Sequence, residues 1–191
     1  MNRLFLISPA QCDGKRAAML LAAKAKFGLA VRMREPAGAP LADVFTFLSG
    51  LYFRGKIAYA RAFARPPEGV AGAFVITSSR GLRSPEEPID ATVLREFAAV
   101  PIDVDEDRYH RPLAVDARAL AEAAGDDCEI VLLGSIATKK YIDVFRETIG
   151  SRLRFPREFV GLGDKSRGAL LLRCVAEGRE LDYRRPDDPS C

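Results

Sequence analysis

The stretch LLGSIATKKYIDVF, residues 132–145, contains the transition that decides the fold. Its apolar beginning predicts a buried strand that ends at Gly134 and Ser135, and a helix is expected to start near Thr138. Lys139 and Lys140 stand at this predicted helix start. Because the N-terminus of a helix carries partial positive charge, two cations there are unfavourable for the helix alone. Their position predicts an anion, most simply a phosphate, bound nearby.

Similar transitions occur at three other places in the chain. Apolar segments at 3–8, 73–78 and 153–161 each lead through Ser or Gly to cations, and helix starts usually follow. The strands are continuous apolar runs that alternate with helices, which is typical of a parallel sheet covered on both faces. We therefore predict an α/β fold with a single domain over 1–185, a mainly parallel sheet with helices on both faces, and a tail at 186–191.

The longer amphipathic runs predict the helices between these strands. A helix over 14–28 would be closed by Gly28. The run 41–64 predicts one helix or two, with a break near Ser49–Gly50 or at Gly55. Another helix is expected over 116–125, and the last residues before the tail predict an edge strand.

In an open parallel sheet, the carboxyl ends of the strands lie along one edge, where ligands bind. The cations and hydroxyl groups that follow the strands should therefore converge at that edge and hold phosphate groups. The residues predicted to bind phosphate or nucleic acid are Lys15, Arg16, Tyr52, Lys139, Lys140, Tyr141, Lys165, Ser166 and Arg167.

Four short motifs occur in an order that resembles the YaaA family of bacterial DNA-binding peroxide-stress proteins. They are LISPA at 6–10, LSGLY at 48–52, LGSIATKKY at 133–141 and DKSRGALLLR at 164–173. The resemblance covers about half of the chain as separate motifs. Gln11 stands where the family usually has Lys, and the chain is shorter than family members. The resemblance implies an α/β protein that binds nucleic acid, with DNA as the preferred partner, and a role in stress response.

The alternative is an enzyme that acts on a nucleotide, nucleoside or modified base by glycosidic cleavage or transfer. Its candidate catalytic residues are Ser8, Asp13, Arg80 and Ser135, with Asp13 as the favoured carboxylate. A third hypothesis is an interaction module whose partner is another protein. On the run 52–61, Tyr52, Lys56 and Tyr59 share one helical face, which fits either base stacking or an ordinary buried face with a snorkelling cation.

The remaining features narrow the class of protein. Net charge is +3, four cysteines stand far apart, and no apolar run is long enough to span a membrane. We predict a cytoplasmic protein with reduced thiols, no membrane partner, no metal site and no resident cofactor. The P-loop pattern is broken, because Asp164 stands before Lys165. Cys12 beside cations could be a reactive thiolate or a buried loop cysteine, and His110 in an acidic stretch is expected at the surface.

Overall fold

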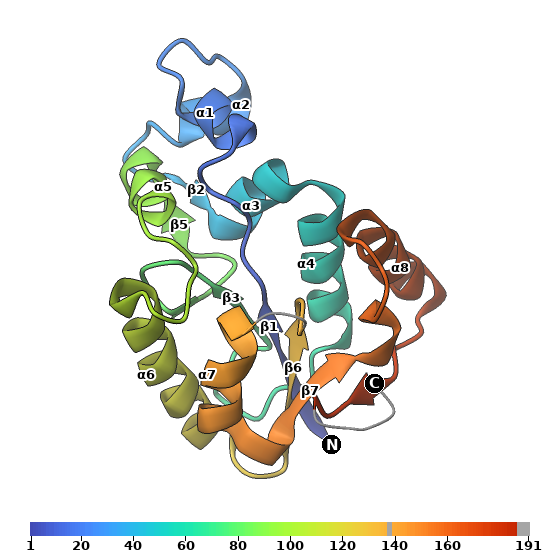
Figure 1. Ribbon diagram of the computed structural model, residues 1–191. Helices are drawn as coiled ribbons and strands as arrows, with labels where there is room; N and C mark the ends of the chain where they lie inside the picture. Colours follow the sequence, from blue (N-terminus) through green and yellow to red (C-terminus); the bar gives the residue numbers. More distant parts are fainter. Residues whose placement is uncertain (137–138, 187–191) are drawn as a thin grey trace.

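The computed structural model describes residues 1–136 and 139–186 and contains one six-stranded sheet at its centre (Figure 1). The strand order is β4-β3-β1-β6-β7-β8. Four inner strands are parallel, and the two edge strands are antiparallel to their neighbours. The strands are β1 (Asn2–Ile7), β3 (Ala73–Ile76), β4 (Leu82–Arg83), β6 (Cys128–Leu133), β7 (Leu153–Pro156) and β8 (Tyr183–Arg184). The predicted α/β class and the predicted edge strand are both confirmed.

The chain changes direction across the sheet at β1. After β1 it continues to β3 on one side, and it later returns to β6 on the other side of β1. Such a point in a parallel sheet leaves a crevice outside the carboxyl end of the strands, because the connections diverge there. The sequence Ser8–Asp13 leaves β1 directly into this region.

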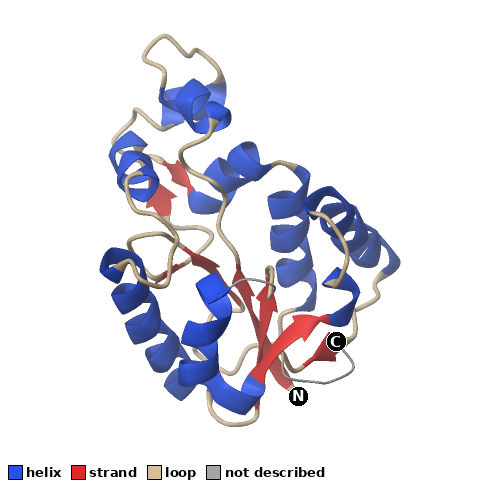
Figure 2. Ribbon diagram, in the orientation of Figure 1, coloured by secondary structure: helices blue, strands red, loops and turns tan. Residues whose placement is uncertain are grey.

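Helices cover both faces of the sheet (Figure 2). Side chains alternate along β1, so Phe5 and Ile7 belong to one apolar core and Leu4 and Leu6 to the other. The first core includes α3 (Leu41–Ser49), α4 (Leu51–Phe63) and α8 (Asp164–Glu177). The second includes α6 (Asp107–Ala124) and α7 (Lys139–Ile149). The chain therefore forms a three-layer α/β domain.

The helix expected over 14–28 is wrong in its second half. The chain instead forms α1 (Lys15–Leu21), a loop, and α2 (Gly28–Arg32), so Gly28 begins a helix rather than closing one. Arg34 donates to the carbonyl oxygens of Ala22 and Ala25 at 3.4 and 2.6 Å. These bonds hold the intervening loop, where few side chains are buried and a longer helix would gain little from packing.

The structure also decides two other predictions about helices, the break in the run 41–64 and the start of the helix expected at 116. The run 41–64 forms two helices, α3 and α4, which are separated at Gly50 with a φ of 64°. Helix α6 begins nine residues earlier than the expected 116 and contains Pro112. Its early part is held by a cap from the Glu106 carboxylate and by burial of Tyr109 and Leu113.

The remaining short elements complete the domain. They are α5 (Ala91–Ala98), the small antiparallel ribbon of β2 (Ala39–Pro40) and β5 (Pro88–Ile89), and the 3-10 turns η1 (Gly150–Arg152) and η2 (Arg157–Phe159). Among the described helices, none has the length and apolar character needed to cross a membrane. Most of the predicted tail, 187–191, lies outside the described residues.

Candidate functional site

A cavity of about 670 Å³ lies at the carboxyl end of the sheet, where the chain changes direction. The loops after β1, β3 and β6 contribute to it, as the strand-end pattern predicts. Helices α3, α4, α7 and α8 and the segment after α5 complete the wall. The residues that line it are Ser8–Asp13, Phe45, Leu48, Ser49, Tyr52, Ser78, Phe97–Ile102, Ser135, Lys140, Tyr141, Asp164 and Arg167.

The two sides of this cavity differ in chemistry. Phe45 and Leu48 of α3, with Phe97 and the residues that follow it, form an apolar side. Helices α7 and α8 contribute Lys140, Asp164 and Arg167 to the other side. A ligand with a flat apolar part and an anionic part would match this division, because each part would meet its complement.

Ser8 lines the cavity and is hydrogen-bonded to a buried lysine. Its hydroxyl donates to the carbonyl oxygen of Leu133 at 3.1 Å. Lys56 of α4 is 1% exposed, and its Nζ donates to the Ser8 carbonyl oxygen at 2.7 Å and to Ser8 Oγ at 2.8 Å. The Lys56 Nζ also lies 4.3 Å from the centre of the Tyr52 ring. Ser8 therefore connects the cavity lining to a buried amine.

No carboxylate of the described residues forms an ion pair with Lys56. Burial lowers the pKa of Lys56 to about 7, while Asp164 acts to raise it and Arg167 to lower it further. The amine can therefore be neutral or charged near neutral pH, and an anion in the cavity would favour the charged form.

Tyr52 has a buried hydroxyl group without a hydrogen-bond partner among the described residues. The side chain is 7% exposed and lines the cavity. Burial raises the pKa of Tyr52 to about 12, although the Arg167 guanidinium opposes this shift both by its charge and by its close approach to the hydroxyl, short of a well-formed hydrogen bond. The hydroxyl is therefore protonated at neutral pH and available to donate. A buried polar group without a partner costs free energy, which a ligand atom could recover.

Arg167 lies beside Tyr52 with much of its guanidinium group engaged. Its Nε and Nη2 donate to the carbonyl oxygen of Phe159 at 3.1 and 2.9 Å. Its Nη1 lies 3.7 Å from Oδ1 of Asp164, whose side chain is 74% exposed. Arg167 is thus held in place while its charge faces the cavity.

Lys140 and Tyr141 come from the first turn of α7. Lys140 is exposed at the cavity, and its carbonyl oxygen accepts a hydrogen bond of 2.7 Å from the Tyr109 hydroxyl. Burial raises the pKa of Tyr141 to about 12, so this phenol is also protonated at neutral pH. Ser135 lines the cavity just before this helix. The side chain of Lys139 lies outside the described part of the chain.

The structure brings many, but not all, of the predicted site residues together. Those that line the cavity are Ser8, Asp13, Tyr52, Ser135, Lys140, Tyr141 and Arg167. Lys15, Arg16, Lys165 and Ser166 are exposed outside it, and Arg16 donates to the Phe47 carbonyl oxygen at 3.1 Å. Arg80 is also outside the described lining, and it forms an ion pair of 2.6 Å with Glu96.

Other hypothetical sites have less support. Cys12 is a buried loop cysteine whose thiol donates to the Ala10 carbonyl oxygen, and burial and Asp13 raise its pKa to about 12, which disfavours a reactive thiolate. His110 is half-buried on α6, away from the described cavity lining, rather than in a loop. Among the described residues, no group of His, Cys, Asp or Glu side chains is arranged to hold a metal ion.

The basic C-terminal part of the sequence is less available for ligands than its composition indicates. From Lys139 to Arg185 there are 12 Lys and Arg against 7 Asp and Glu. Many of the arginines form ion pairs within the protein, at Arg146, Arg154, Arg157, Arg167, Arg179 and Arg184. Much of the predicted basic patch is therefore paired within the protein, while Lys140, Lys165 and Arg173 are exposed.

The sequence reasoning missed Lys56 as a site residue and missed the apolar wall after α5. The signal for Lys56 was its position four residues after Tyr52 on an otherwise apolar face. Tyr59 on the same face is fully buried, and its hydroxyl lies 2.5 Å from that of Tyr183. The buried interpretation of this face is therefore correct for Tyr59, but Lys56 is itself buried instead of reaching the surface, and Tyr52 also borders the cavity.

In comparisons with known proteins, no family model, curated protein or solved structure matches the chain.

Proposed function

We propose that this protein binds a nucleotide unit in the cavity at the carboxyl end of its sheet. The observation that carries the proposal is the buried Tyr52 hydroxyl, which has no partner among the described residues and lies at the cavity beside the charge of Arg167. A hydrogen-bond acceptor on an anionic ligand would supply the missing partner.

The shape and chemistry of the cavity support this ligand class. A volume of about 670 Å³ is within the range of ordinary small-molecule sites. A base would pack against Phe45, Leu48 and Phe97, while the phosphate would lie near Lys140 and Arg167. Lys140 stands in the first turn of α7, where the helix dipole alone disfavours a cation, so a bound phosphate would relieve this conflict.

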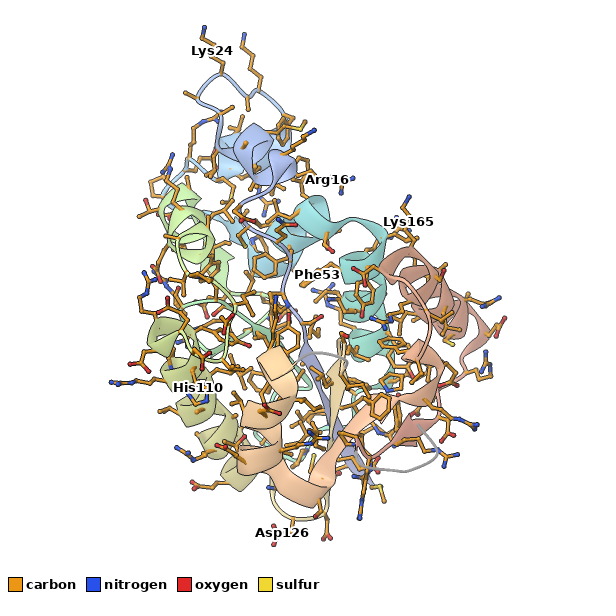
Figure 3. The ribbon with its side chains drawn as sticks, viewed as in Figure 1. Arg16, Lys24, Phe53, His110, Asp126 and Lys165 are labelled. Carbon is orange, nitrogen blue, oxygen red and sulfur yellow. The ribbon has the colours of Figure 1, made fainter. Side chains whose placement is uncertain are left out.

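A second observation favours nucleic acid as the source of the nucleotide. We name residues 14–34 the basic arm; it contains six Lys and Arg and no Asp or Glu. This segment projects beyond the sheet domain, with Lys24 at its outer end (Figure 3). It follows Gln11–Asp13 of the cavity wall directly, so a strand held by the arm could place one nucleotide in the cavity.

The motif resemblance to the YaaA family adds a preference for DNA to this proposal. The same motifs contribute to the cavity through Ser8 and Pro9, Ser49 and Tyr52, Ser135 and Tyr141, and Asp164 and Arg167. The four sequence signals are thus brought to one place in the fold, which supports a shared ligand site.

The test is a binding titration with deoxynucleoside 5′-monophosphates, single-stranded DNA, duplex DNA and RNA at several salt concentrations. Lys140→Ala should weaken all binding by roughly 10- to 100-fold, because a charge-assisted hydrogen bond contributes about 1.5–3 kcal/mol. Lys165→Ala is the matched control, because this lysine is exposed on α8 outside the described lining. Equal effects of the two changes, or no binding of any ligand at low salt, would contradict the proposal.

A further inference from the structure

The contact between Ser8 and Lys56 combines features of a reactive pair. Ser8 faces the cavity, whereas Lys56 lies behind it and is fully enclosed. The Nζ to Oγ distance of 2.8 Å is a direct hydrogen bond. A serine hydroxyl becomes a nucleophile when an adjacent base can accept its proton.

The environment of Lys56 favours a neutral amine. No carboxylate of the described residues pairs with its Nζ, although the rings of Tyr52 and Phe53, at 4.3 and 5.1 Å, attract the charged form. Burial lowers the pKa of Lys56 to about 7. Its facing charged groups, Asp164 and Arg167, act in opposite directions. A base with a pKa near the working pH is well matched to both accept and return a proton.

The surroundings of Ser8 offer stabilisation for a reacting anion. In the described chain, the N–H groups of Ala10 and Gln11 make no hydrogen bond, and both residues line the cavity. Arg167 and Lys140 supply positive charge at the same cavity. Such preorganised donors and charges stabilise the oxyanions that develop in group transfer.

We propose that Ser8 is a nucleophile and Lys56 its general base, acting on the phosphoryl group of a phosphate ester bound in the cavity. This inference rests on the proposed function and adds a reaction to it. The substrate class is a phosphate ester of a nucleoside, either free or as a phosphodiester within nucleic acid.

The reaction proceeds in two balanced steps. The Ser8 hydroxyl turns from the Leu133 carbonyl oxygen to Lys56, Oγ bonds to phosphorus, and its proton passes to the neutral amine. The phosphorus–oxygen bond to the leaving group breaks, and the leaving oxygen takes its electron pair and the proton from Lys56. Water then bonds to phosphorus, Ser8 is released, and Lys56 carries the proton from water back to Oγ. Nothing is oxidised or reduced.

A fluorophosphonate probe tests the nucleophile directly, because it forms a bond from phosphorus to serine oxygen with loss of fluoride. Mass spectrometry of the intact protein and its peptides should show one label on Ser8. Ser8→Ala should abolish labelling, whereas Ser151→Ala, a change in an exposed serine outside the described cavity lining, should keep it. Lys56→Gln should slow labelling by roughly 100-fold or more, in the range typical of general base catalysis.

The pH dependence of labelling in the unchanged protein provides a test that needs no variant to fold. The rate should rise through neutral pH and level off as Lys56 loses its proton. Absence of labelling at pH 8, labelling that persists in Ser8→Ala, or a folded Lys56→Gln that reacts at the original rate would overturn the inference.

The substrate itself is tested with two chromogenic esters: p-nitrophenyl phosphate and the p-nitrophenyl ester of thymidine 5′-monophosphate. Release of nitrophenol from the diester, lost in Ser8→Ala, would identify the phosphodiester class, while release from the monoester would identify the free monoester class. If neither ester is hydrolysed, the inference is overturned. Because Ser8→Ala leaves Lys140, Arg167 and Tyr52 in place, nucleotide binding by this variant separates failure of the reaction from failure of the proposed function.

Discussion

Gly168 of α8 packs directly against Tyr52 of α4: a Cβ atom added at Gly168 would lie 2.8 Å from the Tyr52 Cα. Gly55 forms the other side of this crossing, since a Cβ there would lie 2.8 Å from the Gly168 carbonyl oxygen. This close approach puts Tyr52 of α4 beside Arg167 of α8 at the cavity. The two glycines therefore position the site as well as the helices.

Gly168→Ala should destabilise the protein by about 1–3 kcal/mol, because backbone atoms of α4 cannot move aside as a side chain could. The helix preference of Ala offsets only about 1 kcal/mol of the cost of overpacking. Urea unfolding would measure the change. Gly28→Ala is the control, since a Cβ there meets nothing within 4 Å and its φ is not positive. Equal stability of the two variants would show that the helices do not cross this closely.

Tyr52→Phe should leave the free energy of unfolding unchanged or raise it, by up to about 2 kcal/mol. The hydroxyl it removes is buried and has no partner in the described structure, so its desolvation is not compensated before a ligand binds. Thermal or urea unfolding without ligand gives the measurement. Phe is the matched change because it keeps the ring that lies over Lys56. A loss of stability above about 1 kcal/mol would reveal a hydrogen bond at this hydroxyl.

Lys56→Met should change how stability depends on pH. In the wild type, the folded-state pKa of Lys56 is near 7 and lies below its unfolded value of 10.5. The unfolded chain therefore binds more protons between these values, and wild-type stability should rise with pH relative to the variant. The difference should be flat below pH 7 and change by at most about 1.4 kcal/mol per pH unit above it.

Urea unfolding of both proteins at pH 6, 7.5 and 9 would check this dependence. Asp164, Arg167 and Tyr52 face Lys56 and remain in both proteins, so their own titrations largely cancel in the comparison. A difference in stability that is constant over this range would show that Lys56 keeps its ordinary pKa in the folded protein.

The double change Lys24→Ala/Lys26→Ala in the basic arm should distinguish the binding of nucleic acid from the binding of a mononucleotide. Both lysines are exposed and lie away from the described cavity lining, so mononucleotide affinity should be unchanged. Binding to single-stranded DNA should weaken, and the slope of log affinity against log salt should become shallower by about 1–1.5, since about 0.7 is expected for each lost phosphate contact. The matched control is Arg61→Ala on α4, an exposed cation outside both the arm and the cavity lining. If the salt slopes of the wild type and the double variant agree within error, the basic arm does not hold the nucleic acid.

Much of the architecture could be predicted because it depends on local patterns. The apolar runs that form β1 and β6 are continuous, and their alternation with helices is enough to indicate a parallel sheet. The break at Gly50 also follows from one residue that tolerates positive φ. The end of α1 could not be predicted, because Arg34 fixes the following loop through carbonyl groups distant in sequence.

The site was only partly predictable for a related reason. Convergence of strand ends indicated Ser8, Ser135 and Lys140, since the sheet itself brings them together. Lys56 could not be distinguished from a surface cation, because its role depends on a contact with Ser8, 48 residues away. Arg80 looked equivalent to the other cations, but its pairing with Glu96 depends on how α5 packs.

Calorimetric titration of the four deoxynucleoside 5′-monophosphates into the wild-type protein and Tyr52→Phe tests the central claim most directly. We expect saturable binding of one nucleotide per chain, weakened by roughly five- to tenfold in Tyr52→Phe as one hydrogen bond is lost. Absence of heat from all four nucleotides at millimolar concentration, or equal affinity of the two proteins, would contradict a nucleotide site built around the Tyr52 hydroxyl.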